Sequence, residues 1–209
     1  MIEVDIDNWE RKQHFEFFRR MDNPLYNICF DLDISELLPF IKQHHLSLNH
    51  TMVFLSIKAA NQTENFRYRL RDDKVVLHDK LTPSFTSISK ETNLFRYITV
   101  EFVDDVFQFN ENAEQIVKKQ TEYFPTENNH RDDFIYFSSI PWISFTGLDH
   151  ATDTKNVDSV PRIMWGKFYQ KENRTVIPYN LQVNHCFIDG YHLGLFKERL
   201  DLEIKSLTS

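Results

Sequence analysis

The sequence predicts an α/β fold in which helices cover one side of a mixed β-sheet. Segments with the two-residue alternation of strands interleave with segments of helical periodicity along the whole chain. The chain contains neither a glycine-rich phosphate loop nor the regular strand–helix–strand repeat of a nucleotide-binding sheet. A purely parallel, doubly wound sheet is therefore not expected.

Two kinds of helix signal occur in the first half of the chain, namely a capping residue with a stop signal and a segment that is apolar on nearly all sides. Asp7 or Asn8 is expected to cap an opening helix that stops before Asn23 and Pro24. The segment that starts at Ser47 is apolar on nearly all sides over four turns, which indicates a helix buried against a sheet. The predicted elements are a helix at 9–20, a strand at 26–35, helices at 34–42 and 47–63, and a hairpin at 66–79 that turns at Asp72-Asp73.

The second half is richer in predicted strands and shows no internal repeat, low-complexity tract or linker. Residues 1–209 are therefore expected to form a single domain, whose length is sufficient to bury a sizeable core. The predicted elements are a strand at 94–102, a helix at 110–122, strands at 134–139, 144–148, 162–170 and 175–185, and a final helix from Gly190.

Composition excludes several classes of function. A net charge of -7 argues against nucleic acid as the main partner, because no basic face is expected. Cys29 and Cys186 are too few for a disulfide framework and fit a reducing compartment as buried thiols. Neither a signal peptide nor a run of 18 apolar residues is visible, so a cytoplasmic protein without a membrane partner is expected.

The stretch QVNHCFIDGYH, residues 182–192, carries the strongest chemical signal. His185 ends an apolar strand, and a turn with Asp189 and Gly190 follows directly before the last helix. An imidazole fixed at such a rigid edge is suited to act as a general base, since it is largely neutral near pH 7. The alternative is a buried structural histidine that is satisfied by hydrogen bonds.

Two other chemistries are less well supported by the sequence. His185 and His192 are seven residues apart, and no third ligand completes a familiar zinc pattern, so no metal is expected. A serine–histidine–aspartate triad would be expected to place its serine in a G-x-S-x-G elbow, and the chain has none.

Several segments, in one order along almost the whole chain, resemble the trimeric chloramphenicol acetyltransferase family, which uses acetyl-CoA. They are NWERKQHFEFF, FRYRL, HDKLTPSFT, SSIPWISFT, WGKFYQ and QVNHCFIDGYHLGLF. The last motif, His-x-x-x-Asp-Gly, is also similar to motifs of dihydrolipoyl acyltransferases and peptide-synthetase condensation domains. The resemblance implies a two-layer sandwich with this coenzyme A-dependent acyltransferase fold.

The resemblance also implies catalytic roles for four residues. His185 matches the base that deprotonates the acceptor hydroxyl, which then attacks the thioester of acetyl-CoA directly. Ser138 matches the serine that stabilises the tetrahedral oxyanion. Asp189 matches a carboxylate paired with an arginine of the opening helix, here Arg11, and this pair would hold the turn and the histidine in place.

In the family, active sites lie between the subunits of a homotrimer, and an antibiotic pocket faces the neighbouring subunit's histidine. The aromatic residues that fall at pocket positions are Phe17, Phe18, Phe124 and Tyr136, although core packing is the alternative for the phenylalanines. Trp142, Lys167 and Phe168 fall near positions that serve coenzyme A, with a solvated surface lysine as the alternative for Lys167.

The departures from the family concern the acceptor. Asn184 replaces the first of two adjacent histidines, and Met164 replaces a threonine that helps to hold a water. Leu148, His150 and Arg162 stand at pocket positions where the family usually has apolar, larger or neutral side chains. An unpaired buried Arg162 would be costly, so it is expected to point outward, pair with an acid or reshape the pocket.

The resemblance implies O-acetylation of a small molecule, with chloramphenicol as the leading acceptor and antibiotic inactivation as the outcome. Two alternatives remain open at this point. One is an acetyltransferase for a different hydroxylated acceptor. The other is a trimeric binding protein of the same fold whose catalysis is impaired, which would agree with Met164 and Asn184.

Overall fold

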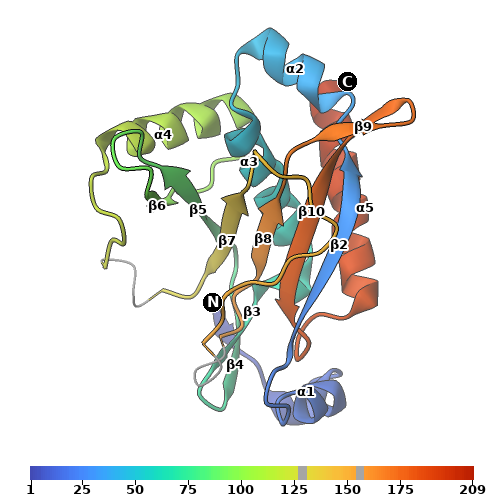
Figure 1. Ribbon diagram of the computed structural model, residues 1–209. Coiled ribbons are helices and arrows are strands. Elements are labelled where there is room, and N and C mark those ends of the chain that lie inside the picture. The colour runs from blue at the N-terminus through green and yellow to red at the C-terminus, as the bar shows by residue number, and fades with distance from the viewer. Residues whose placement is uncertain (127–130, 154–157) are drawn as a thin grey trace.

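The structure is a computed structural model that describes residues 1–126, 131–153 and 158–209. It confirms the predicted α/β class: a mixed sheet has helices on one side (Figure 1). The helices are α1 (Lys12–Phe18), α2 (Leu37–His44), α3 (Leu48–Asn61), α4 (Val106–Lys119) and α5 (Gly190–Thr208), with short 3-10 turns at Ile6–Asn8 and Glu64–Arg67.

Two sheets are formed by the described residues, and the larger one carries the site. Its order is β2-β10-β8-β7-β5-β6, with β9 paired to the other end of β10. The pairs β5–β7 and β7–β8 are parallel, whereas the others are antiparallel, so the sheet is mixed. Its strands are β2 (Leu25–Asp33), β5 (Thr82–Ile88), β6 (Phe95–Thr99), β7 (Phe134–Ser139), β8 (Arg162–Trp165), β9 (Tyr169–Lys171) and β10 (Arg174–Asn184).

A smaller antiparallel sheet lies at one end of the molecule. It contains β1 (Ile2–Glu3), β4 (Lys74–Leu77) and β3 (Tyr68–Arg71) in that order. The hairpin between β3 and β4 turns where the sequence predicts, and Asp72 adopts a left-handed φ of 53° that short polar side chains tolerate.

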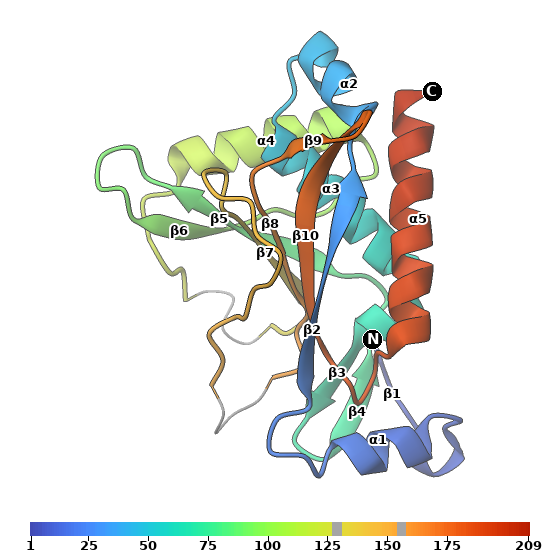
Figure 2. The ribbon, with the colours of Figure 1, turned by 45° about the vertical axis from the view of Figure 1, so that its right-hand side comes forward.

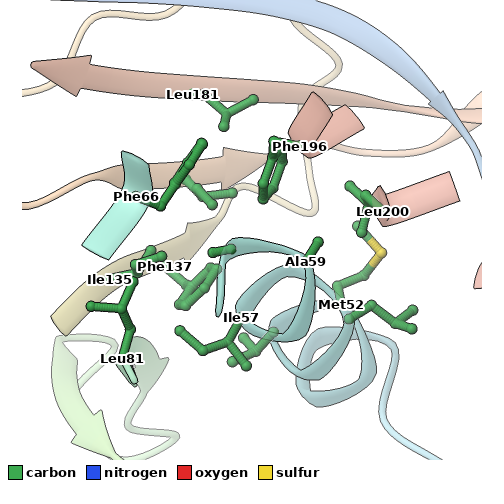
Figure 3. Close-up of a cluster of buried hydrophobic side chains, with 14 of the residues drawn as sticks. Met52, Ile57, Ala59, Phe66, Leu81, Ile135, Phe137, Leu181, Phe196 and Leu200 are labelled. Atoms are coloured by element: carbon green, nitrogen blue, oxygen red, sulfur yellow. The ribbon is translucent and has the colours of Figure 1, made fainter. Parts of the chain in front are cut away.

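Helix α3 occupies the centre of the helical layer, which explains why it is apolar on nearly all sides. Ser47 caps it by accepting a hydrogen bond from the backbone N–H of His50. Figure 3 shows Met52, Ile57 and Ala59 of this helix against side chains of the sheet and of α5, including Leu181 and Phe196. Burying such side chains contributes about 1.5–3 kcal/mol each, which makes this cluster a main source of stability.

The two faces of β10 differ, and this difference places the site. Tyr179, Leu181 and Val183 point into the core on the helix side, whereas Asn180 and Gln182 point to the opposite face. Figure 2 shows the segment after β7 on the side of the sheet away from α5. There the Asn180 side chain contacts His150 and the carbonyl of Leu148. Strand β10 therefore presents polar side chains on the second face of the sheet.

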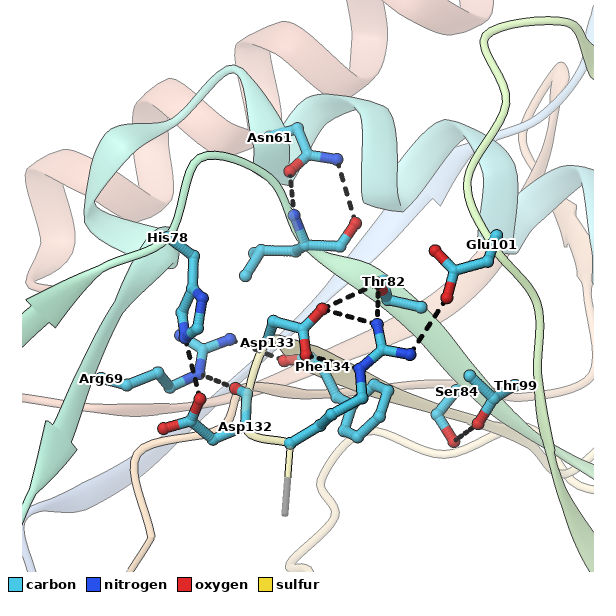
Figure 4. A network of polar contacts seen from close by, with 12 residues as sticks. Asn61, Arg69, His78, Thr82, Ser84, Thr99, Glu101, Asp132, Asp133 and Phe134 are labelled. Atoms are coloured by element: carbon cyan, nitrogen blue, oxygen red, sulfur yellow. Dashed lines mark hydrogen bonds and ion pairs between the residues drawn. The ribbon is translucent and has the colours of Figure 1, made fainter. Parts of the chain in front are cut away.

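A buried polar network fixes the start of β7 to the hairpin (Figure 4). Arg69 is almost fully buried and donates to four backbone carbonyls, including those of Asp132 and Phe134. Burial lowers the pKa of Arg69 to about 10, so the guanidinium remains charged at neutral pH. Four carbonyl acceptors compensate for the desolvation of this charge.

Several predicted boundaries were wrong. The opening helix begins at Lys12 rather than near Trp9, because a 3-10 turn closed by the bond from Trp9 N to Ile6 O precedes it. The predicted strand at 144–148 is irregular, and Ser144 instead bonds to the carbonyl of Lys167. The predicted strand at 162–170 is divided into β8 and β9 around Gly166.

Other elements were missed or shifted. The strands β1 and β5 were not predicted, and β5 proves to lie inside the main sheet between β7 and β6. Helix α4 begins four residues before the predicted Asn110, because the Asp105 side chain caps it through the N–H of Gln108.

Candidate active site

His185 lies immediately after β10, where packing fixes its ring. Its backbone N–H donates to the carbonyl of Pro24 at 2.8 Å. The imidazole stacks on Phe18 with 3.8 Å between ring centroids and an interplanar angle of 7°, and Tyr26 lies 4.5 Å away on a tilted ring. Nδ1 is buried and has no hydrogen-bond partner among the described residues. Nε2 is thus the ring nitrogen available to accept a proton from outside.

The predicted ion pair between Arg11 and Asp189 is present and supports the turn that holds His185. Arg11 Nη1 donates to Asp189 Oδ2 at 2.8 Å, while its Nε and Nη2 donate to the carbonyls of Cys186 and His185 at 2.9 and 3.2 Å. Burial raises the pKa of Asp189, but the hydrogen bond from Arg11 and nearby positive charge outweigh it, and the net pKa is lowered.

Asp189 also connects the turn to the last helix. Its side chain caps α5 by accepting from the N–H of Tyr191, and its own N–H donates to His192 Nδ1 at 3.2 Å. Asn184 closes the other side of the turn, since its Oδ1 accepts from the N–H of Cys186 at 2.9 Å. Both ends of the turn around His185 are therefore fixed by side chains.

A cavity of about 820 Å³ opens on the polar face of the main sheet. Such a volume suits a drug-sized ligand. Its lining combines aromatic rings with hydroxyl groups and is supplied mainly by β5, β6, β7 and β8. The lining residues include Phe95, Tyr97, Phe124, Tyr136, Ser138 and Met164.

Ser138 faces this cavity at the end of β7. Its Oγ is 2.9 Å from Thr86 Oγ1 on the neighbouring strand β5. A threonine hydroxyl that donates to the serine leaves the serine proton free for a ligand. Sequence reasoning missed Thr86 because β5 was not predicted, and without that strand nothing places the two hydroxyls together.

Arg162 pairs with an acid, which is one of its three expected outcomes. Its guanidinium pairs with Asp158, with Nη2 2.6 Å from Oδ2, and it also lines the cavity beside Tyr136. His150 lines the cavity as well and bonds through Nε2 to Asn180 Oδ1 at 2.9 Å. Burial lowers the pKa of His150, so its imidazole is neutral at pH 7. The cavity thus carries polar groups on one wall.

Of the other residues predicted for the pocket, three lie outside the cavity and three line it. Phe17 is 62% exposed and packs edge-on against Phe18, which itself covers His185, so both lie at the histidine and do not line the cavity. Leu148 is also outside the cavity lining, and its carbonyl accepts from Asn180. Phe124, Tyr136 and Met164 do line it.

Within one chain, His185 and Ser138 are far apart. Strand register places Ser138 beside Met164 and Met164 beside Asn180, five residues before His185. Five strand residues and two strand spacings correspond to a separation on the order of 20 Å. Groups that act on one reacting centre must lie within hydrogen-bond reach of it, so a single chain does not bring these two side chains to one centre.

The three residues predicted to serve coenzyme A lie on two adjoining segments. The N–H of Lys167 donates to the carbonyl of Ile143 at 2.8 Å, so 142–144 and 166–168 run together. Trp142 is 67% exposed and Phe168 is 43% exposed, which leaves both rings available to a ligand. Gly166 permits this approach because an added Cβ would lie 2.7 Å from the carbonyl oxygen of Ile143.

Among the described residues, no group of three or more His, Cys, Asp or Glu side chains could hold a metal ion. Within the same part of the chain, every helix is too short or too polar to cross a membrane.

Comparison with known proteins identifies the family. The family model for chloramphenicol acetyltransferase matches residues 1–201. Chloramphenicol acetyltransferase 3 of Escherichia coli is 28% identical over 202 residues, covering 94% of this chain and 93% of the relative. Another Escherichia coli chloramphenicol acetyltransferase is 30% identical over 196 residues, with 91% and 88% covered. The chain belongs to the chloramphenicol acetyltransferase family.

Solved structures agree with this assignment. A chloramphenicol acetyltransferase structure superposes with a TM-score of 0.89 at 27% identity, covering 97% of this chain and 100% of that one. The dihydrolipoamide acetyltransferase of Azotobacter vinelandii has a TM-score of 0.67 at 16% identity, with 93% and 88% covered, and shares the fold. The predicted family resemblance and fold are both confirmed.

Proposed function

We propose that this protein transfers the acetyl group of acetyl-CoA to a hydroxyl of chloramphenicol and so inactivates the antibiotic. The observation that carries the proposal is His185 with its ring fixed between Phe18 and Tyr26, so that only Nε2 is free to take a proton. Membership of the chloramphenicol acetyltransferase family supports the same reaction.

The chemistry follows from two side chains. His185 Nε2 accepts the proton of the acceptor hydroxyl, and the oxygen attacks the thioester carbonyl carbon. Ser138 donates a hydrogen bond to the oxyanion of the tetrahedral intermediate. Its Oγ lies 2.9 Å from Thr86 Oγ1 and can accept the hydroxyl proton of Thr86 at the same time. When the carbon–sulfur bond breaks, the imidazolium returns its proton to the sulfur, and the histidine is regenerated.

The distance between the two side chains supports a site shared by two copies of the chain. His185 of one subunit would face Ser138 and the cavity of its neighbour in a closed homotrimer. Exposed aromatic side chains at both places, Phe17 near the histidine and Phe124 at the cavity, are suited to burial in such an interface. Light scattering tests this arrangement: three copies are expected, and a monomer would exclude the shared site.

Acetyl-CoA would bind along the two adjoining segments that carry Trp142, Lys167 and Phe168. The lysine can meet a phosphate, and the aromatic rings can lie along the pantetheine or adenine. The described cysteines, Cys29 and Cys186, are both free, which supports a reducing compartment such as the cytoplasm, where acetyl-CoA is available.

The test is release of coenzyme A thiol from acetyl-CoA with chloramphenicol as the acceptor. Wild type should release thiol rapidly, and His185→Ala should be slower by about 10²- to 10⁴-fold because the base is lost. His14→Ala is the matched control, since His14 is an exposed histidine of α1. Equal rates for wild type and His185→Ala would exclude His185 as the base.

A different hydroxylated acceptor is the second candidate, and one observation favours it. Arg162, Asp158 and His150 make one cavity wall polar. Thiol release with other hydroxyl compounds, but not with chloramphenicol, would support that candidate over the first.

A further inference from the structure

We infer that Arg162 is an acceptor-specificity residue, whose guanidinium binds an oxygen-bearing, hydrogen-bond-accepting group at the end of the acceptor remote from the reacting hydroxyl. The inference rests on the proposed acetyltransferase function and names the class of acceptor that this cavity favours. That class is an aromatic alcohol with a carboxylate or a similar oxygen group across the ring.

Arg162 is held in a fixed position on the cavity wall. Both of its terminal nitrogens contact Asp158, at 2.6 and 3.2 Å, and the Arg162 side chain is only 16% exposed. Its guanidinium carbon lies 5.9 Å from the ring centroid of Tyr136. A guanidinium that is already oriented loses little entropy when a ligand binds to it.

Within the described part of the chain, one guanidinium donor on the wall of the cavity is left without a partner. Among the described residues that line it, Arg131 and Arg162 are positive and Asp158 is negative. Arg131 is bound to Asp133 and Glu101, whereas Nε of Arg162 has no hydrogen-bond partner among the described residues. Arg162 therefore retains a donor for an acceptor oxygen.

The spacing between Arg162 and Ser138 matches the length of a substituted ring. Arg162 pairs in register with Tyr136, which is two residues before Ser138 on the adjacent strand β7. Two residues along a strand and one spacing between strands place the Cα atoms of Arg162 and Ser138 about 8 Å apart. A benzene ring whose hydroxyl substituent reacts near Ser138 is therefore long enough to extend its opposite substituent toward Arg162. The rings of Tyr97 and Phe124, 5.5 Å apart, offer faces for such a planar molecule.

Two alcohols isolate this contact in a binding experiment. The probes are 4-(hydroxymethyl)benzoate and 4-methylbenzyl alcohol, which share the ring and the hydroxyl but differ in the group that would face Arg162. Calorimetric titration of each into the full-length protein gives the ratio of the two dissociation constants without requiring turnover.

Wild type should bind the carboxylate about 10-fold more tightly than the methyl compound, as expected for a hydrogen bond to a charged group. Arg162→Met should abolish the preference. Asp158→Asn should increase it, because the guanidinium then lacks its internal partner. Arg174→Met, a change at an exposed position at the far end of β10, should leave the ratio unaltered.

The inference is overturned if wild type shows no preference, or if Arg162→Met retains it. Since Asp158→Asn acts in the opposite direction, loss of preference through misfolding is distinguishable from loss of the contact. The thiol-release assay separates this result from the proposed function. A preference without thiol release contradicts only the transferase proposal, and thiol release without a preference contradicts only the role of Arg162.

Discussion

The Arg11 guanidinium donates to Asp189 at 2.8 Å and thereby joins the start of α1 to the residue that caps α5. The same side chain binds the carbonyls of His185 and Cys186. Arg11→Met should therefore lower the free energy of unfolding by about 2–4 kcal/mol, because it leaves a partly buried carboxylate without its partner. Activity should fall with stability, and urea unfolding measured beside thiol release checks both.

The double variant Arg11→Met/Asp189→Asn is the control for that prediction. Removing both charges should recover part of the stability that the single change loses. If the double variant loses as much free energy of unfolding as the two single variants together, the two side chains are not coupled.

Ser138→Ala should lower kcat by about 10²- to 10³-fold, since one donor to the oxyanion disappears. The KM for the acceptor should change little, because the hydroxyl acts on charge that develops in the transition state. Steady-state kinetics with acetyl-CoA in excess checks both values. A rise in KM at constant kcat would assign Ser138 to acceptor binding instead.

Asp132 should make stability depend on pH on the acid side. Burial raises its pKa, but the hydrogen bonds from Arg71 and His78 outweigh burial and hold the pKa well below its ordinary value. The ionised form therefore stabilises the fold above about pH 4, the unfolded-state pKa, and this contribution is lost as the pH falls further. The free energy of unfolding should change less between pH 7 and pH 2 in Asp132→Asn than in wild type. An equal change in the two proteins would contradict this.

Gly166→Ala should weaken the binding of acetyl-CoA. The added Cβ would lie 2.7 Å from the carbonyl oxygen of Ile143 and push apart the segments that carry Trp142 and Lys167. The KM for acetyl-CoA should rise, while the dissociation constant of the acceptor should be unchanged. Gly194→Ala is the matched control, because a Cβ there meets nothing within 4 Å.

The sequence predicted elements with strong local signals. Helix α3 was predicted because its own side chains are apolar on nearly all sides. The turn at Asp72 was predicted because two polar residues separate two segments with the residue alternation of strands. Strand β5 was missed because its burial depends on β6 and β7, which are distant in sequence. The segment at 144–148 resembles a strand locally, yet no neighbouring strand pairs with it among the described residues.

In the candidate site too, residues with a local sequence signal were predicted and residues without one were missed. His185 and Asp189 were found through a short motif, and their link to Arg11 came from the family resemblance. Thr86 carries no motif of its own, and only the neighbouring position of strands β5 and β7 places it beside Ser138. Asp158 lies just four residues before Arg162, but no motif marks the two as a pair. Contacts between residues far apart in sequence follow from tertiary packing, which residue patterns alone do not specify.

The most direct test is complementation between two inactive variants, His185→Ala and Ser138→Ala. Because each proposed site takes His185 from one subunit and Ser138 from its neighbour, mixed trimers of equal amounts should contain about one quarter intact sites. Co-unfolded and co-refolded mixtures should then regain roughly one quarter of the wild-type thiol release with chloramphenicol. Activity that stays at the mean of the two separate variants would contradict a site shared between subunits.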